Sequence, residues 1–153
     1  MIKLVAVISV VFLTMGAFAQ NSGYVKNLED ACDLFVAGSD LHDSILLGLV
    51  PDSYEEFELL YGTTAPDNRM EETGFFYSVT KQIFDKLMIE KKEGFYLPCL
   101  QLGSFADGEF GEAFIERLDI IIPRDKDRFC NSGLDQEYLN RNPLQFYYEK
   151  YCK

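Results

Sequence analysis

The stretch EETGFFYSVTKQIFDKLMIEKKEG, residues 71–94, decides the fold because its apolar residues recur at helical spacing. Its charged residues fall mainly on one side, and its apolar stripe repeats every four residues at Phe75, Val79, Ile83 and Leu87. This pattern predicts an amphipathic helix with one face packed against a core. We expect Lys91 and Lys92 in its last turn and Gly94 as its cap.

Shorter segments with apolar residues three or four apart surround this helix, and most of them end near glycine or proline. They occupy residues 23–38, 51–62, 95–105, 109–122, 123–133 and 134–153. Asp52 or Ser53 is a suitable N-cap for the second segment, and Pro143 interrupts the last. The isoleucines at 120–122 are β-branched and could form a strand, but the residues before them keep helical spacing. The sequence therefore predicts an all-α fold, a small bundle or irregular array of about five to seven short helices.

The first 19 residues have the layout of a secretory signal peptide. A single positive residue, Lys3, precedes an uncharged run that ends in the small-residue pattern Ala17-Phe18-Ala19. A retained membrane anchor is the alternative, but the uncharged run is shorter than the roughly 20 residues that a spanning helix needs. The sequence thus predicts a signal peptide over 1–19 and a single helical domain over 20–153. The product would be secreted or extracytoplasmic, with no membrane span after cleavage.

Removal of residues 1–19 would leave 134 residues with 13 basic and 25 acidic side chains, a formal net charge of −12. A chain with this excess of acid repels phosphate backbones, so a nucleic-acid partner is not expected. The same charge also favours solubility on its own, without any specific acidic function.

The four cysteines, Cys32, Cys99, Cys130 and Cys152, predict two disulfides in an exported chain. A structural zinc site is the alternative, but no two cysteines have the spacing of zinc ligands and the chain has a single histidine. Three pairings are possible. If Pro143 folds the C-terminal segment back, Cys130 can reach Cys152, which favours Cys130–Cys152 together with Cys32–Cys99.

The segment GSFADGEFGEAF, residues 103–114, gathers carboxylates that could hold a metal ion or begin a helix. A calcium-binding loop that starts at Asp107 would need glycine where Glu112 stands. As a helix start the segment fits well, with Asp107 as N-cap and the glutamates in the first turn. No metal site is predicted, and the weak candidates for a cation are Glu109, Glu112 and Glu116.

No set of residues forms a catalytic constellation in the sequence, so no catalytic residue and no cofactor is predicted. His42, the single histidine, has no positioned nucleophile beside it. The glycines of GEFGEAF lack the lysine and the preceding strand of a phosphate-binding loop. A hydrolase that uses a pair of carboxylates stays open, because many acidic residues are present but no local pattern selects two of them.

We expect a secreted, disulfide-stabilised helical protein without enzymatic activity, which acts by binding another protein or as a structural extracytoplasmic component. The alternative is a carrier for a small apolar ligand. Its cavity would be lined by large apolar residues of the 71–94 helix and one later residue, namely Phe75, Phe76, Val79, Ile83, Phe84 and Phe114. The expected partner is accordingly an unknown protein or a small apolar ligand.

Overall fold

The computed structural model describes residues 22–153, so the predicted signal peptide lies outside the described range. The chain divides after Leu49 into two compact units, each of which is described by itself below. We call them the N-terminal unit, residues 22–49, and the C-terminal unit, residues 50–153. All regular secondary structure in both is helical, which confirms the all-α prediction, and no helix within residues 22–153 is long and apolar enough to cross a membrane. The expectation of a single domain over 20–153 stays a prediction.

The N-terminal unit contains a helix that runs through residues 22–36 and the short helix α2 (Asp43–Gly48). The first helix stops near Gly38, which has a φ of 70°, a conformation that glycine adopts without steric cost. The hydroxyl of Tyr24 donates to the Leu49 carbonyl at 3.0 Å, which ties the beginning of the unit to its end.

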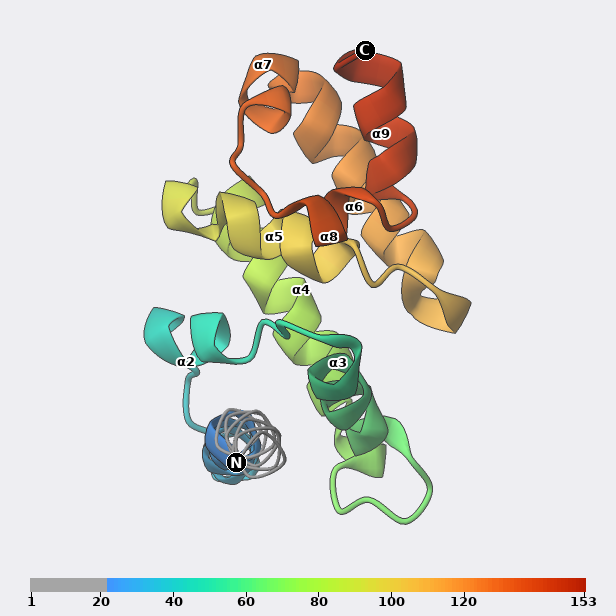
Figure 1. Cartoon of the computed structure of the whole chain (residues 1–153). Coiled ribbons are helices and arrows are strands. Elements are labelled where there is room, and N and C mark those ends of the chain that lie inside the picture. The colour runs from blue at the N-terminus through green and yellow to red at the C-terminus, as the bar shows by residue number, and fades with distance from the viewer. Residues whose placement is uncertain (1–21) are drawn as a thin grey trace, which may run out of the picture. The chain divides into compact units, whose positions relative to one another are not determined.

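The C-terminal unit consists of α-helices joined by short 3₁₀ turns, and the sequence-predicted segments appear in it in order (Figure 1). The α-helices are α3 (Tyr54–Tyr61), α4 (Phe75–Met88), α5 (Tyr96–Gly103), α6 (Gly111–Arg124), α7 (Lys126–Cys130), α8 (Gln136–Leu139) and α9 (Leu144–Tyr151). The 3₁₀ turns are η1 (Gly62–Thr64), η2 (Glu71–Thr73), η3 (Glu93–Phe95) and η4 (Gly108–Phe110).

Helix α4 forms the centre of the C-terminal unit and contacts α5, as its apolar stripe predicted. The stripe from Phe75 to Leu87 is buried along its length. The predicted end was wrong, because α4 stops at Met88 and the chain then turns. Lys91 adopts a left-handed φ of 59°, and the Lys92 amide donates to the Lys86 carbonyl. Lys91 and Lys92 therefore lie beyond the last turn, and Gly94 belongs to η3.

Helix α6 includes the three isoleucines, so the helical interpretation of this stretch is confirmed. It continues through Pro123 and ends at Arg124, two residues beyond the predicted end at Ile122. Asp107 is an N-cap, as predicted, but of the turn η4, where its carboxylate accepts the Gly108 amide at 2.7 Å. A methyl group at Gly103, the last residue of α5, would lie 2.8 Å from both Leu118 methyl carbons, so the glycine permits close packing of α5 on α6.

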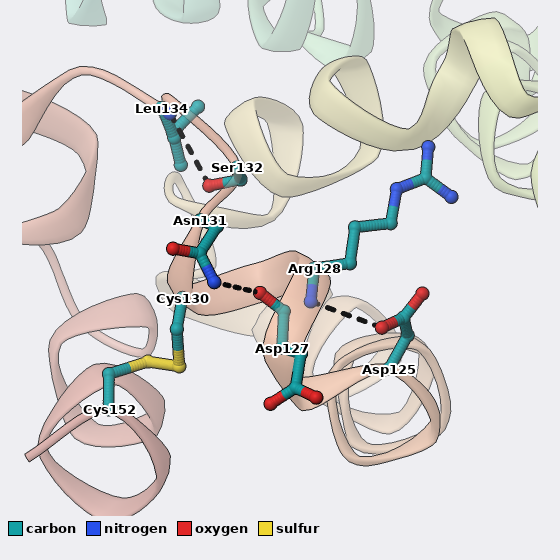
Figure 2. Close-up of a disulfide and its surroundings, with 8 residues drawn as sticks. All are labelled: Asp125, Asp127, Arg128, Cys130, Asn131, Ser132, Leu134 and Cys152. Atoms are coloured by element: carbon teal, nitrogen blue, oxygen red, sulfur yellow. Dashed lines mark hydrogen bonds between the residues drawn. A yellow bond between two sulfur atoms is a disulfide. The ribbon is translucent and has the colours of Figure 1, made fainter.

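The C-terminal segment folds back as predicted. Helices α8 and α9 lie before and after Pro143, and α9 contacts α7. The peptide bond between Asn142 and Pro143 is cis. Cys130 at the end of α7 and Cys152 just after α9 form a disulfide with Cα atoms 5.4 Å apart, which confirms this pairing (Figure 2).

The prediction of a second disulfide between Cys32 and Cys99 was wrong, because both residues remain thiols. Cys99 lies wholly buried in α5, and its thiol faces the Ile83 carbonyl of α4 at 3.5 Å. Its side chain is therefore part of the α4–α5 contact. An even number of cysteines carries no information on side-chain direction, so it could not reveal that these two remain thiols.

Candidate functional site

The six residues predicted to line an apolar cavity come together in the C-terminal unit. Five lie on α4 and Phe114 lies on α6, and all six are at most 2% exposed. The Phe84 and Phe114 ring centroids are 5.6 Å apart, and the Phe76 ring contacts those of Tyr61 and Phe110 at 5.3 and 5.4 Å. The structure thus buries all six residues in a core that these ring contacts run through, which is the ordinary role of aromatic residues.

The three weak cation candidates belong to two consecutive elements, η4 and α6. Glu112 and Glu116 are exposed on α6, and Glu109 belongs to the turn η4. Within the described part of the chain, no three His, Cys, Asp or Glu side chains are placed to hold a metal ion together. His42 is exposed and stands directly before α2, with no side-chain hydrogen bond to the helix end.

A groove of about 520 Å³ lies in the C-terminal unit between the end of α3, the segment 62–74 and the start of α4. We call it the α3–α4 groove. Its aromatic wall includes Tyr61 and Tyr77, and its polar wall includes Glu58 and Glu71. Tyr77 is 49% exposed, so a partner could reach a large part of its ring.

Local hydrogen bonds give the segment 62–74 a defined shape. The Thr63 hydroxyl donates to the Leu60 carbonyl at 2.8 Å, and the Thr73 hydroxyl donates to the Met70 carbonyl at 2.7 Å. The Asn68 side chain accepts the Met70 amide at 2.9 Å, and the Met70 side chain is 1% exposed. These bonds join residues two or three apart and so fix the local turns of the segment, as Thr and Asn do elsewhere. Residues 63–70 lie in none of the helical segments predicted from the sequence, and the Thr and Asn residues of this stretch were the overlooked signal.

The charged residues that line the α3–α4 groove are all acidic. Two carboxylates, those of Glu58 and Glu71, are among its lining residues, and no lysine or arginine is. Both glutamates are exposed. The potential in the groove is therefore negative, and it favours a cationic group over an anionic one.

The N-terminal unit has its own open concavity of about 600 Å³ between its first helix and α2. Asp30, Asp33, Asn27 and Ser44 contribute most of its polar wall. Most of its lining residues have polar side chains, and none of its lining residues is aromatic. Aromatic anchors carry much of the binding energy at protein interfaces, so the α3–α4 groove is the better candidate for a binding site. Among known proteins, no family model, no curated sequence and no solved structure matches this chain.

Proposed function

We propose that this chain is a secreted, disulfide-stabilised helical protein without enzymatic activity that binds a basic segment of another protein. The observation that carries the proposal is the α3–α4 groove, where exposed tyrosine surface lies beside two exposed carboxylates. The groove lies within a unit that is stabilised by the Cys130–Cys152 disulfide.

The chemistry of the groove favours an arginine- or lysine-rich segment with apolar side chains. Tyrosine rings attract cations through their π faces and also bury apolar surface. Glu58 and Glu71 add charge complementarity, and the whole chain has a formal net charge of −11. A basic partner would therefore be attracted at long range and then held by the tyrosines.

The size of the groove fits a few side chains of a partner. Its volume of about 520 Å³ lies inside the range of about 300–1,000 Å³ that is typical of specific pockets. An extended peptide segment that inserts two or three side chains satisfies this volume, whereas the face of a folded domain would leave it unfilled.

The proposal is tested with two synthetic peptides of equal length, one of arginine and leucine and one of glutamate and leucine, by fluorescence anisotropy. The basic peptide should bind and the acidic one should not. Tyr77→Ala, and separately Glu58→Lys with Glu71→Lys, should each weaken binding by about tenfold or more, the loss typical of a central interface residue.

Two matched controls separate the groove from general charge and surface effects. Glu55→Lys with Glu112→Lys reverses two exposed carboxylates outside the groove, the same charge change as in the double groove variant, and Phe146→Ala removes an exposed aromatic ring on α9. Both should bind the basic peptide as the unmodified chain does. The proposal would be refuted if the control variants lost as much affinity for the basic peptide as the groove variants, or if the unmodified chain bound both peptides equally well.

A further inference from the structure

A second, smaller pocket of about 210 Å³ lies in the C-terminal unit among the end of α4, the end of α6, the start of α5 and the beginning of α7. We call it the α4–α6 pocket. One part of its wall is apolar and comes from two helices, with Leu87, Met88, Ile120 and Ile121. Ile120 is 55% exposed, which places apolar surface at an accessible edge of the pocket.

The polar wall contains a buried hydroxyl group that lacks a partner. Tyr96 is 4% exposed, and within residues 22–153 its hydroxyl makes no hydrogen bond. Buried polar groups are almost always hydrogen-bonded, because an unpaired one costs stability. Tyr96 lines the pocket, and so do Arg128, Asp125 and Glu93, the charged residues that act on its phenol.

Most charges around the pocket are already engaged. Arg128 stacks on the Tyr96 ring, with its guanidinium carbon 3.8 Å from the ring centroid, and forms an ion pair with Glu93. Figure 2 shows its side chain extended away from the disulfide. Asp125 accepts the Arg128 amide at 3.1 Å, and the Lys91 ammonium donates to the Met88 carbonyl.

Arg124 is the exception among these charges. It is exposed in the last turn of α6 and lines the pocket, and it forms no ion pair within the described part of the chain. The pocket therefore offers three complementary features, an apolar wall, a hydroxyl donor without an acceptor and a guanidinium without a counterion.

We propose that the α4–α6 pocket binds a small amphipathic carboxylate, whose apolar body packs on Ile120 and Met88 while its carboxylate accepts the Tyr96 hydroxyl and pairs with Arg124. This proposal does not depend on the α3–α4 groove. Burial raises the pKa of Tyr96 to about 12, so the phenol remains a neutral hydrogen-bond donor near neutral pH.

The pocket selects for one negative charge and for small size. Glu93 and Asp125 in its wall would repel a dianion such as a phosphate monoester, and they leave one guanidinium to balance one carboxylate. The volume is below the range of about 300–1,000 Å³ that drug-sized ligands occupy. A short aliphatic chain or a single aromatic ring fits this space.

The test uses the protein from residue 20 to residue 153 in NMR titrations. The four probes are octanoate, benzoate, octanol and octylamine. Octanoate or benzoate should bind and shift the methyl signals of Met88 and Ile120, and comparison of the two identifies an aliphatic or an aromatic body. Ile115, on α6 but outside the pocket lining, is the control methyl. Octanol should bind at least about fivefold more weakly, and octylamine should not bind, since each lacks the charged hydrogen-bond acceptor.

Two variants assign the roles of the polar groups. Tyr96→Phe and Arg124→Gln should each weaken carboxylate binding by about fivefold or more, the effect of one lost hydrogen bond or ion pair. Arg124→Lys should retain most of the affinity. Without ligand, Tyr96→Phe should melt at the same temperature as the unmodified chain or higher, because it removes an unpaired buried hydroxyl, so weaker binding would not reflect unfolding.

Matched controls are Tyr54→Phe and Lys81→Gln, which make similar changes outside the pocket. Both should leave carboxylate affinity unchanged. The proposal is overturned if no carboxylate binds at millimolar concentration, if octanol binds as well as octanoate, or if Tyr96→Phe and Arg124→Gln retain full affinity.

Discussion

Tyr147 links the C-terminal helix to α6 through one hydrogen bond. Its hydroxyl donates to the Asp119 carboxylate at 2.7 Å, and the Tyr147 side chain is 2% exposed. Burial and the bond to Asp119 both raise the pKa of Tyr147. The folded state therefore holds the phenolic proton more tightly than the unfolded state does.

We expect Tyr147→Phe to lower the free energy of unfolding by about 1–2 kcal/mol at neutral pH, because it removes a hydrogen bond to a charged acceptor. A phenol with a raised pKa contributes stability that is fully present below its unfolded pKa of about 10 and is lost as the pH rises toward its folded pKa. The difference between the two proteins should therefore shrink above about pH 10. Urea unfolding at neutral and alkaline pH measures both effects.

A double-mutant cycle with Asp119→Asn provides the control for Tyr147→Phe. The two substitutions should be non-additive, since both remove the same contact. If the two losses of unfolding free energy were additive, the hydrogen bond would not couple α9 to α6.

Glu56 shows how a side chain can have a role that its local sequence only partly reveals. The Ser53 hydroxyl accepts the Glu56 amide at 3.2 Å, which confirms Ser53 as N-cap of α3, and the Glu56 carboxylate in turn accepts the Asp52 amide at 2.7 Å. Burial raises the pKa of Glu56, although the bond from the Asp52 amide opposes this. The spacing of Ser53 and Glu56 is that of a capping box, but the burial of Glu56 depends on packing.

At the scale of the helix, the start of α4 depends on a glycine. Gly74 stands at its N-cap position with a φ of 67° and a ψ of 23°, between η2 and the helix. A side chain there would be strained by its own backbone, although no heavy atom of the described chain beyond the adjacent residues lies within 4 Å of an added Cβ. The free-energy cost of a substitution therefore comes from the backbone conformation of residue 74 and not from a clash with residues of other segments.

We expect Gly74→Ala to destabilise the C-terminal unit by about 1–2 kcal/mol, the energy of placing a non-glycine residue in the left-handed region. Gly94→Ala is the matched control, because Gly94 has a negative φ and open space around its Cα. Thermal unfolding followed by circular dichroism should separate the two variants. Equal melting temperatures would show that the α4 start tolerates this conformation in any residue.

At the scale of the whole chain, a single disulfide closes the C-terminal segment. Cys130 and Cys152 are 22 residues apart in sequence. The loss of chain entropy on closing a loop of this length corresponds to about 3 kcal/mol of stabilisation. We expect the double variant Cys130→Ser/Cys152→Ser to be less stable by roughly this amount in urea unfolding.

Thiol titration supplies the control for that experiment. The denatured, unreduced chain should show two reactive thiols, those of Cys32 and Cys99, and so should the double serine variant. In the native protein both cysteines are buried, and burial raises the pKa of the Cys99 thiol, so their reaction should be slow. Four reactive thiols, or none, in the denatured unmodified chain would contradict the cysteine pattern of the structure.

The sequence by itself determined the helical class and the α4 stripe, narrowed the α3 cap to Asp52 or Ser53, and favoured the Cys130–Cys152 pairing. Each depends on interactions between residues close in sequence or, for the disulfide, on a proline that turns a short segment. The failures at Lys91 and Pro123 concern the last turn of a helix, where local preferences are weak and packing of the following segment decides.

Only the tertiary structure decided which side chains meet across distant segments. It turned the Cys99 thiol toward the Ile83 carbonyl, and it buried the six expected cavity residues, with the Phe84 and Phe114 rings in contact. It also placed the Arg141 guanidinium carbon within 5 Å of the rings of Tyr54, Phe105 and Tyr138. It likewise left the Tyr96 hydroxyl buried without an acceptor among residues 22–153, and it made Tyr96, Arg124 and Arg128 part of the wall of one pocket. These relations follow from how helices pack, which fixes side-chain neighbours that helical periodicity and caps do not specify.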